Sequence, residues 1–117
     1  MTYIDGFVAA VPKANKAQYI THARSVGELA KQWGALRIVE NWGDDVPPGE
    51  QTDFQRAVAA KDDEIIVFSW IEYPDKATRD VVMKRMMEDP AMAELPGMPF
   101  DGKRMIYGGF STLLDIG

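Results

Sequence analysis

The sequence predicts a single α+β domain, spanning residues 1–117, that is built from two strand-helix-strand halves. Three observations lead to this prediction. The length is that of one domain, sufficient to bury one core and too short for two. Segments with the period of a β-strand alternate with two long amphipathic segments in the order β-α-β, β-α-β. Three of the four strands carry apolar side chains on both faces, and two helices alone cannot cover all of these faces.

The first half begins with a β-type run at residues 3–11, which Pro12 ends. A helix is expected over residues 16–33, because Asn15 can act as its N-cap and Gly34 stands where a left-handed C-cap belongs. Inside this helix an apolar stripe recurs at spacings of four and three residues: Tyr19, Ala23, Val26, Ala30 and Trp33. The first long helix is therefore predicted to pack on a sheet.

The middle of the chain is expected to hold a second strand, a long loop and a short helix. Residues 35–42 alternate in polarity, as a half-buried strand does. The following segment, 43–49, is acidic and rich in Pro and Gly, which breaks regular structure. Thr52 can cap a short helix over residues 54–59 before the chain turns into its second half.

The second half has the same element order, without a visible sequence repeat. Residues 64–73 form a β-type run that is strongly apolar on both faces and ends at Pro74. Asp75 is placed to cap a second long helix, which continues to residue 88. One valine and three methionines supply its apolar arc: Val82, Met83, Met86 and Met87.

A short helical turn and a loop are expected before the last strand. Asp89 suits an N-cap and Pro90 suits the first helical position that follows it. Residues 95–102 are rich in Pro and Gly and are predicted to form the loop. The last strand is expected over residues 105–116, with a bulge or a close backbone approach at Gly108-Gly109.

Four strands and two long helices in this order fit a ferredoxin-like βαββαβ sandwich, a four-stranded antiparallel sheet with both helices on one face. The other face of the sheet is then left bare. Because no further long element remains in the chain to cover it, we expect a homodimer that forms through the open sheet face.

Composition and charge exclude several classes of function. The net charge of −5 disfavours nucleic acid as a partner, because binding to phosphates needs a basic stripe. No apolar run approaches the roughly 20 residues that span a bilayer, and the N-terminus lacks the pattern of an export signal, so no membrane association is expected. With no cysteine and a single histidine, we expect a cytoplasmic protein with no metal site and no cofactor.

Four separated segments match the pattern of a known family: Asp5-Gly6-Phe7-Val8 with Val11-Pro12-Lys13, Trp42-Gly43-Asp44-Asp45-Val46-Pro47, Phe68-Ser69-Trp70-Ile71-Glu72-Tyr73-Pro74, and Pro99-Phe100-Asp101-Gly102-Lys103-Arg104-Met105-Ile106-Tyr107-Gly108-Gly109-Phe110. Together they resemble the YbaA-like bacterial proteins, a domain-of-unknown-function family placed in the dimeric α+β barrel superfamily. The resemblance spans nearly the whole chain. It implies a ferredoxin-like fold whose sheet pairs with a second sheet in a dimeric α+β barrel.

The resemblance does not imply one activity. The wider superfamily contains cofactor-free monooxygenases, haem-degrading enzymes, lactone isomerases and dye-decolourising peroxidases, and a shared fold is a weak warrant for a shared function. The haem-degrading relatives place a histidine ligand on the second helix, whereas residues 75–88 contain no histidine. Haem binding by that route is therefore disfavoured.

Four residues are predicted to bind a ligand: His22, Arg37, Trp70 and Tyr107. His22 lies at the flank of the first helix's apolar stripe, where it can act as a general base or simply make one hydrogen bond at an interface. Trp70 and Tyr107, together with Trp42, can line a pocket for a flat organic molecule, or they can belong to the core or the dimer interface. No catalytic residue can be assigned.

Asp5 interrupts a strand that is otherwise suited to burial. An unpaired buried carboxylate is costly, so a cationic partner is expected. The three expected partners are Arg37, Lys103 and Arg104. A structural ion pair is favoured over a functional acid at this position.

Two further groups of carboxylates need less explanation. Glu40 and Glu72 lie near strand ends, where we expect them to be surrounded by solvent. Four carboxylates gather in or near the long loop, namely Asp44, Asp45, Glu50 and Asp53. They could attract a hard cation, but their spacing matches no calcium-loop pattern, so a solvated acidic loop is favoured.

The predicted function is that of a cytoplasmic homodimer whose protomers each bind a small organic ligand in an apolar pocket between sheet and helices. Two alternatives stay open. The first is a cofactor-independent monooxygenase or isomerase-like enzyme, in which His22, Arg37, Trp70 and Tyr107 orient the substrate and handle a proton or a developing negative charge. The second is a structural or stress-associated interaction protein without catalysis.

Overall fold

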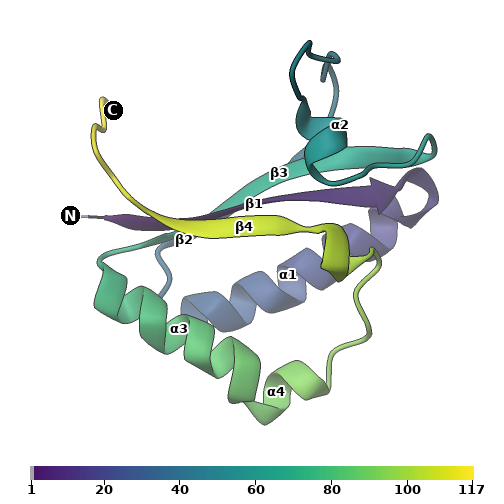
Figure 1. Ribbon diagram of the computed structural model, residues 1–117. Coiled ribbons are helices and arrows are strands. Elements are labelled where there is room, and N and C mark those ends of the chain that lie inside the picture. The colour runs from purple at the N-terminus through teal and green to yellow at the C-terminus, as the bar shows by residue number, and fades with distance from the viewer. Residues whose placement is uncertain (1) are drawn as a thin grey trace.

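The computed structural model describes residues 2–117 and confirms the ferredoxin-like α+β fold (Figure 1). Its helices and strands in chain order are β1 (Tyr3–Pro12), α1 (Lys16–Trp33), β2 (Arg37–Trp42), α2 (Phe54–Ala57), β3 (Glu64–Tyr73), α3 (Lys76–Glu88), α4 (Pro90–Ala93) and β4 (Ile106–Ser111), with 3-10 turns at Lys13–Asn15 and Gly102–Arg104. The four strands form one antiparallel sheet in the order β2-β3-β1-β4. Helices α1 and α3 lie together on one face of this sheet.

The strand register decides which side chains meet the helices. Tyr3 lies opposite Tyr73 in the pairing of β1 with β3, and Ile38 lies opposite Ile71 in the pairing of β2 with β3. These residues and their alternate neighbours face α1 and α3. The helix side holds two clusters of buried residues, one of Ala30, Ala35, Ile71, Tyr73 and Val82, and one of Val11, Tyr19 and Val67. The main core therefore lies between the helices and the sheet.

The opposite face of the sheet is covered only at one end. Val58, which follows α2, is buried there and packs with Val8, Ala10 and Ile66 of the sheet. Figure 1 shows α2 on the side of the sheet away from α1 and α3. The expectation that this whole face is bare is therefore wrong at the α2 end, because isolated apolar residues of the long middle segment cover it. The uncovered remainder of this face is called the open face below.

Helix ends follow the predicted chemistry in part. Gly34 ends α1 with a φ of 128°, a left-handed conformation that favours glycine. Asp75 caps α3, and its Oδ1 accepts a hydrogen bond from the backbone N–H of Thr78 at 2.7 Å. Asn15 precedes α1, but its side chain makes no cap bond and donates instead to the carbonyl of Pro99 at 2.8 Å. That amide therefore ties the start of α1 to the loop before β4.

Several predicted boundaries differ from the structure. Asp53, not Thr52, caps α2, because the Asp53 carboxylate accepts from the backbone N–H of Arg56 at 2.7 Å and an Asp side chain makes a stronger acceptor. Helix α2 ends at Ala57, two residues earlier than predicted. Strand β4 ends at Ser111, although the apolar run predicted a strand to residue 116, because β1, the only neighbour β4 has among the described strands, starts at Tyr3 opposite Ser111.

Asp5 is buried, with 7% of its surface exposed, and is fully paired. Arg79 of α3 donates from Nε to both carboxylate oxygens, at 3.0 and 3.2 Å, and the hydroxyl of Tyr73 donates to Oδ2 at 2.9 Å. Arg79 thus takes the place of the three cations that the sequence suggested: Arg37, Lys103 and Arg104. The prediction was wrong because Asp5 faces the helices, where α3 brings Arg79 down onto the sheet.

A bulge or a close backbone approach was predicted at Gly108-Gly109, but the atoms that lie close to Gly109 belong to side chains. The pairing of β1 with β4 is regular there, with Gly109 opposite Asp5, so the strand carries no bulge at this point. A Cβ atom on Gly109 would lie 2.4 Å from the hydroxyl of Tyr3 and 2.7 Å from Nη2 of Arg79. Glycine at this position therefore leaves room for the arginine that neutralises Asp5.

Candidate functional site

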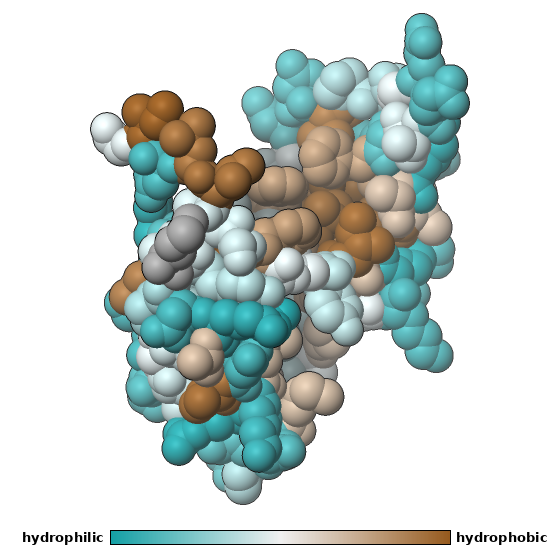
Figure 2. All heavy atoms as spheres, turned by 60° about the vertical axis from the view of Figure 1, so that its left-hand side comes forward, coloured by the Kyte–Doolittle hydropathy of each residue, from teal (hydrophilic) through white to brown (hydrophobic). Residues whose placement is uncertain are grey.

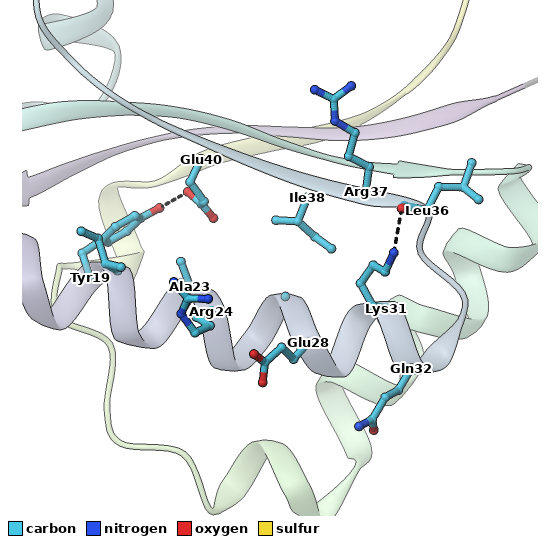
Figure 3. Close-up of a pocket in the computed structure, with 12 residues that line it drawn as sticks. Tyr19, Ala23, Arg24, Glu28, Lys31, Gln32, Leu36, Arg37, Ile38 and Glu40 are labelled. Atoms are coloured by element: carbon cyan, nitrogen blue, oxygen red, sulfur yellow. Dashed lines mark hydrogen bonds between the residues drawn. The ribbon is translucent and has the colours of Figure 1, made fainter.

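An open groove of about 900 Å³ runs between α1 and the edge strand β2 (Figure 3). Its lining residues come from these two elements and the turn between them: Tyr19, Ile20, Ala23, Arg24, Gly27, Glu28, Lys31, Gln32, Leu36, Arg37, Ile38 and Glu40. We call it the α1–β2 groove. It lies on the helix side of the sheet, where the sequence predicted a pocket.

The groove exists because α1 presents small residues to β2. Gly27 is buried and faces Ile38, and a Cβ atom on Gly27 would lie 3.7 Å from three carbon atoms of Ile38, an ordinary van der Waals distance. Ala23 lines the groove one turn earlier in the same helix. The larger side chains of α1, such as Trp33, pack instead against the buried cluster that contains Tyr73 and Val82. Small side chains on one helix stripe therefore leave the space open.

Three polar side chains meet at one end of the groove. The hydroxyl of Tyr19 on α1 donates to Oε1 of Glu40 on β2 at 2.6 Å, and the hydroxyl of Ser69 on β3 donates to the same oxygen at 2.5 Å. Glu40 and Ser69 are direct partners across β2 and β3, and Ser69 is buried. Figure 3 shows the second carboxylate oxygen of Glu40 directed toward α1, into the space between Tyr19 and Ile38. We call these three residues the Glu40 cluster.

The surroundings of Glu40 change its acidity. Burial of the carboxyl group raises the pKa of Glu40 above its ordinary value, and the hydrogen bonds from Ser69 and Tyr19 offset part of that rise. Burial and the neighbouring Glu40 carboxyl raise the pKa of Tyr19. Tyr19 therefore stays protonated and acts as a hydrogen-bond donor, while Glu40 can bind a donor or exchange a proton.

Glu40 differs from two carboxylates of the chain that pair with an arginine. Asp5 has Arg79 at 3.0 Å, and Glu64 has Arg104 at 2.7 Å. Within residues 2–117, no Lys, Arg or His nitrogen lies within 4.0 Å of the Glu40 carboxylate. The carboxyl group of Glu40 therefore lacks an intramolecular counter-ion in the part of the chain that the structure describes.

Glu40 is exposed, as expected near a strand end, but two hydrogen bonds that the sequence did not predict hold its carboxyl group. A signal for its position is present in the alternation of β2, where Ile38, Glu40 and Trp42 share one face and two of the three are apolar. A second signal is Ser69, a hydroxyl in the middle of an apolar strand. Neither signal shows that the two residues are cross-strand partners, because the register depends on the tertiary fold.

The structure does not bring the four predicted ligand-binding residues into one site. Arg37 borders the α1–β2 groove, but its side chain points away from α1, and its Nη1 lies 3.7 Å from Oε2 of Glu72 (Figure 3). Trp70 lies on the open face, and its indole Nε1 donates to the same Glu72 oxygen at 2.8 Å. Tyr107 lies on β4 opposite Phe7 and is 71% exposed. Arg37 and Trp70 therefore meet at Glu72, and Trp70 and Tyr107 both line a hollow on the open face.

His22 lies on α1 outside the residues that line the groove. Its ring meets the edge of Phe100, with the ring centroids 6.4 Å apart. Its Nδ1 atom is buried without a hydrogen-bond partner among the described residues, and burial lowers the pKa of the imidazole. The ligand-binding roles of His22 and of the other three residues stay predictions.

The open face holds a second hollow, of about 560 Å³ and mainly apolar (Figure 2). Its lining comes from β1, β3 and β4 and includes Ile4, Gly6, Val8, Phe68, Trp70, Ile106, Gly108 and Phe110. Three of these side chains are large, apolar and substantially exposed: Phe68, Ile106 and Phe110. Beyond β4, Leu113, Leu114 and Ile116 are more exposed still.

The acidic loop is organised by its own hydrogen bonds. Asp53 accepts from the backbone N–H of Gly49 at 3.2 Å and from Arg56, which also donates to carbonyls of the loop. Across residues 2–117, no group of three His, Cys, Asp or Glu side chains is arranged to hold a metal ion. In the same residues, none of the helices has the length and apolar character needed to cross a membrane.

Comparison with known proteins places the chain among proteins without an assigned activity. Residues 2–102 match the family model described as protein of unknown function (DUF1428). The chain is 55% identical over 116 residues to the uncharacterized protein YbaA of Escherichia coli K12, which covers 98% of this chain and 99% of that protein. YbaA of Shigella flexneri matches to the same extent. The resemblance to YbaA-like proteins is confirmed.

A solved structure is similar in fold. It is described as a dimeric ferredoxin-like protein from an uncultured marine organism, and it matches with a TM-score of 0.57 at 12% sequence identity. The match covers 99% of this chain and 97% of that chain. At this identity the likeness shows the fold alone.

Proposed function

The chain belongs to the DUF1428 family of proteins of unknown function, and from its own surfaces we propose that it is a homodimer that binds a small organic molecule in the α1–β2 groove. The observation that carries this proposal is the Glu40 cluster, in which polar groups from α1, β2 and β3 converge beside an apolar floor. Ligand sites in proteins combine a mainly apolar cleft with a few convergent polar groups. The groove has both features.

The size of the groove also supports ligand binding. Its volume of about 900 Å³ falls within the range of roughly 300–1,000 Å³ that is typical of small-molecule sites. Ile38 and Gly27 supply an apolar floor, and exposed charged side chains of α1 surround the opening.

Binding in the groove can be tested by filling it. Gly27→Met is expected to weaken the binding of a small-molecule fragment by at least about tenfold, because its side chain extends over Ile38, whereas Gly27→Ala adds one methyl group at ordinary contact distance. The measurement is a fragment screen by amide NMR on the wild-type chain, followed by titration of both variants. The amide spectra of the variants also report whether each is folded.

Two outcomes would contradict the groove as the ligand site. One is a screen in which fragments shift only the resonances of the open face, such as those of Trp70 and Phe110. The other is a set of groove-binding fragments whose affinity is the same in the Gly27→Met and Gly27→Ala proteins. A fully folded Gly27→Met protein makes either result decisive.

The second copy in the proposed homodimer lies against the open face. Phe68, Ile106 and Phe110 leave large apolar surfaces exposed there, and such patches mark interaction sites in soluble proteins. A two-fold axis places the same apolar patch on both partners, so each copy covers the other. The dimeric description of the structural neighbour with the same fold supports this assembly.

Phe110→Glu is expected to convert the dimer into a monomer at micromolar protomer concentration, because it places a charge in the centre of an apolar interface. Sedimentation equilibrium measures the mass, which should be twice the chain mass of 13.1 kDa for the wild type and equal to it for the variant. Met87→Glu is the matched control, since Met87 is 85% exposed on α3 and lies away from the open face. A wild-type protein that sediments as a monomer would rule out this assembly.

A further inference from the structure

We propose that the α1–β2 groove recognises a protonated primary amine on a short hydrocarbon body, whose ammonium group donates to Oε2 of Glu40. The inference rests on the proposed function, because it takes the groove as the ligand site. It adds the chemical class of the ligand and the atom that recognises it.

The first argument is that the two carboxylate oxygens of Glu40 have different hydrogen-bond partners. Oε1 accepts hydrogen bonds from both Tyr19 and Ser69, which hold the carboxyl group in one orientation. Oε2 has no hydrogen-bond partner among the described residues and is the oxygen directed into the groove. An acceptor that is fixed in place beside a cleft is suited to an incoming N–H donor.

The second argument is charge. Asp5 and Glu64 each have an arginine from another part of the chain, whereas Glu40 has no cation within 4.0 Å among residues 2–117. Lys31, which also lines the groove, donates to the carbonyl of Leu36 at 3.2 Å. A ligand that carries its own positive charge supplies the counter-ion that Glu40 lacks, and charge-assisted bonds of this kind are the strong ones.

The third argument is the shape and polarity of the walls. The floor beside Glu40 consists of Ala23, Gly27 and Ile38, which can contact a hydrocarbon body but offer it no side-chain hydrogen bond. An ammonium group with an apolar body is therefore complementary to both ends of the groove.

Binding of an amine also has a predictable pH dependence. The ammonium group needs the ionised form of Glu40, and burial raises the pKa of this carboxyl above its ordinary value. Amine affinity is therefore expected to increase as the pH rises through that pKa and then to level off. The other charged or titratable groups around the groove are Tyr19, which stays protonated, Arg24, Glu28 and Lys31 of α1, and Arg37, whose side chain points away from α1.

The experiment compares three probes with one carbon skeleton, n-hexylamine, n-hexanol and hexanoate, by isothermal titration calorimetry at fixed ionic strength. We expect the amine to bind the wild-type chain at least about tenfold more tightly than the alcohol or the acid. Glu40→Gln, which keeps an acceptor for Tyr19 and Ser69, should lose at least about tenfold in amine affinity together with its pH dependence. Glu88→Gln, an exposed residue of α3 that does not line the groove, should leave both within about threefold.

The possible outcomes separate this inference from the proposed function. Equal binding of all three probes, lost in Gly27→Met, would overturn the preference for an amine and retain the groove as a ligand site. Amine binding that survives Glu40→Gln would overturn the assignment of Glu40. Failure of all three probes, at concentrations where fragments from the NMR screen occupy the groove, would overturn the amine class alone.

Discussion

Replacing Arg79 with methionine is expected to lower the free energy of unfolding by about 3–5 kcal/mol, because the substitution leaves the buried carboxylate of Asp5 without its cation. The Asp5 side chain is 10% exposed, and Arg79 contacts both of its oxygens. Tyr73 would remain as a donor to Oδ2, but one neutral hydroxyl cannot balance a buried charge. Methionine keeps most of the apolar length of arginine, so the change isolates the charge.

Urea unfolding followed by circular dichroism measures this effect, at one protomer concentration because dimer formation would add to stability. Asp80→Asn is the matched control. It removes the second partner of Arg79, and the Asp80 side chain is 55% exposed. The free energy of unfolding should therefore fall by less than about 1 kcal/mol. The double variant Asp5→Asn with Arg79→Met should recover a large part of the loss. A loss of less than about 1 kcal/mol in Arg79→Met would show that Asp5 is not a buried charge.

Arg104→Met is expected to cause a loss of stability that approaches that of Arg79→Met. Arg104 makes a bidentate pair with Glu64, with both N–O distances at 2.7 Å, and the Glu64 side chain is 3% exposed. The same guanidinium donates to the carbonyl of Ala59 at 2.9 Å and to Asp101 at 3.0 Å. Arg104 therefore joins the segment after α2, the start of β3 and the turn before β4.

The pH dependence of unfolding reports on this pair. Hydrogen bonds from Arg104 lower the pKa of Glu64 below its ordinary value of 4.5, so the folded state binds the proton of Glu64 less tightly than the unfolded chain. The stabilisation is present above pH 4.5 and is lost as the pH falls through the lowered pKa. Arg104→Met should remove this part of the acid sensitivity. Asp101→Asn, which affects only an exposed partner, should retain it, and equal acid profiles for wild type and Arg104→Met would contradict the assignment.

The elements of the fold could be predicted from local sequence signals. Asp75 and Gly34 mark helix ends through chemistry that involves only nearby residues, and the apolar runs of β1 and β3 identify strands by composition. The predicted N-cap of the short helix α2, Thr52, was one residue too early. Thr52 and Asp53 can both act as cap residues, and the stronger acceptor, Asp53, makes the bond.

The candidate site could not be predicted in the same way. Tyr19 and Glu40 are 21 residues apart in the sequence, and Glu40 and Ser69 are 29 residues apart. Only the register of β2 with β3 and the packing of α1 bring them together. Asp5 and Arg79 are 74 residues apart. Residue types such as Trp and His can be chosen from a sequence as candidates, but the face on which each one lies depends on contacts between distant segments.

The position of Glu40 on an edge strand has a consequence for motion. Among the described strands, β2 is bonded to β3 alone, whereas β1 and β3 each have two neighbours in the sheet. The wall of the groove that carries Glu40 can therefore shift by bending one ladder of hydrogen bonds, while the central strands and the buried clusters on them stay in place. Because Glu40 lies on a flexible edge strand next to a rigid sheet centre, the groove can adjust to hydrocarbon bodies of different width. Amide hydrogens of β2 should accordingly exchange with solvent faster than those of β1 and β3.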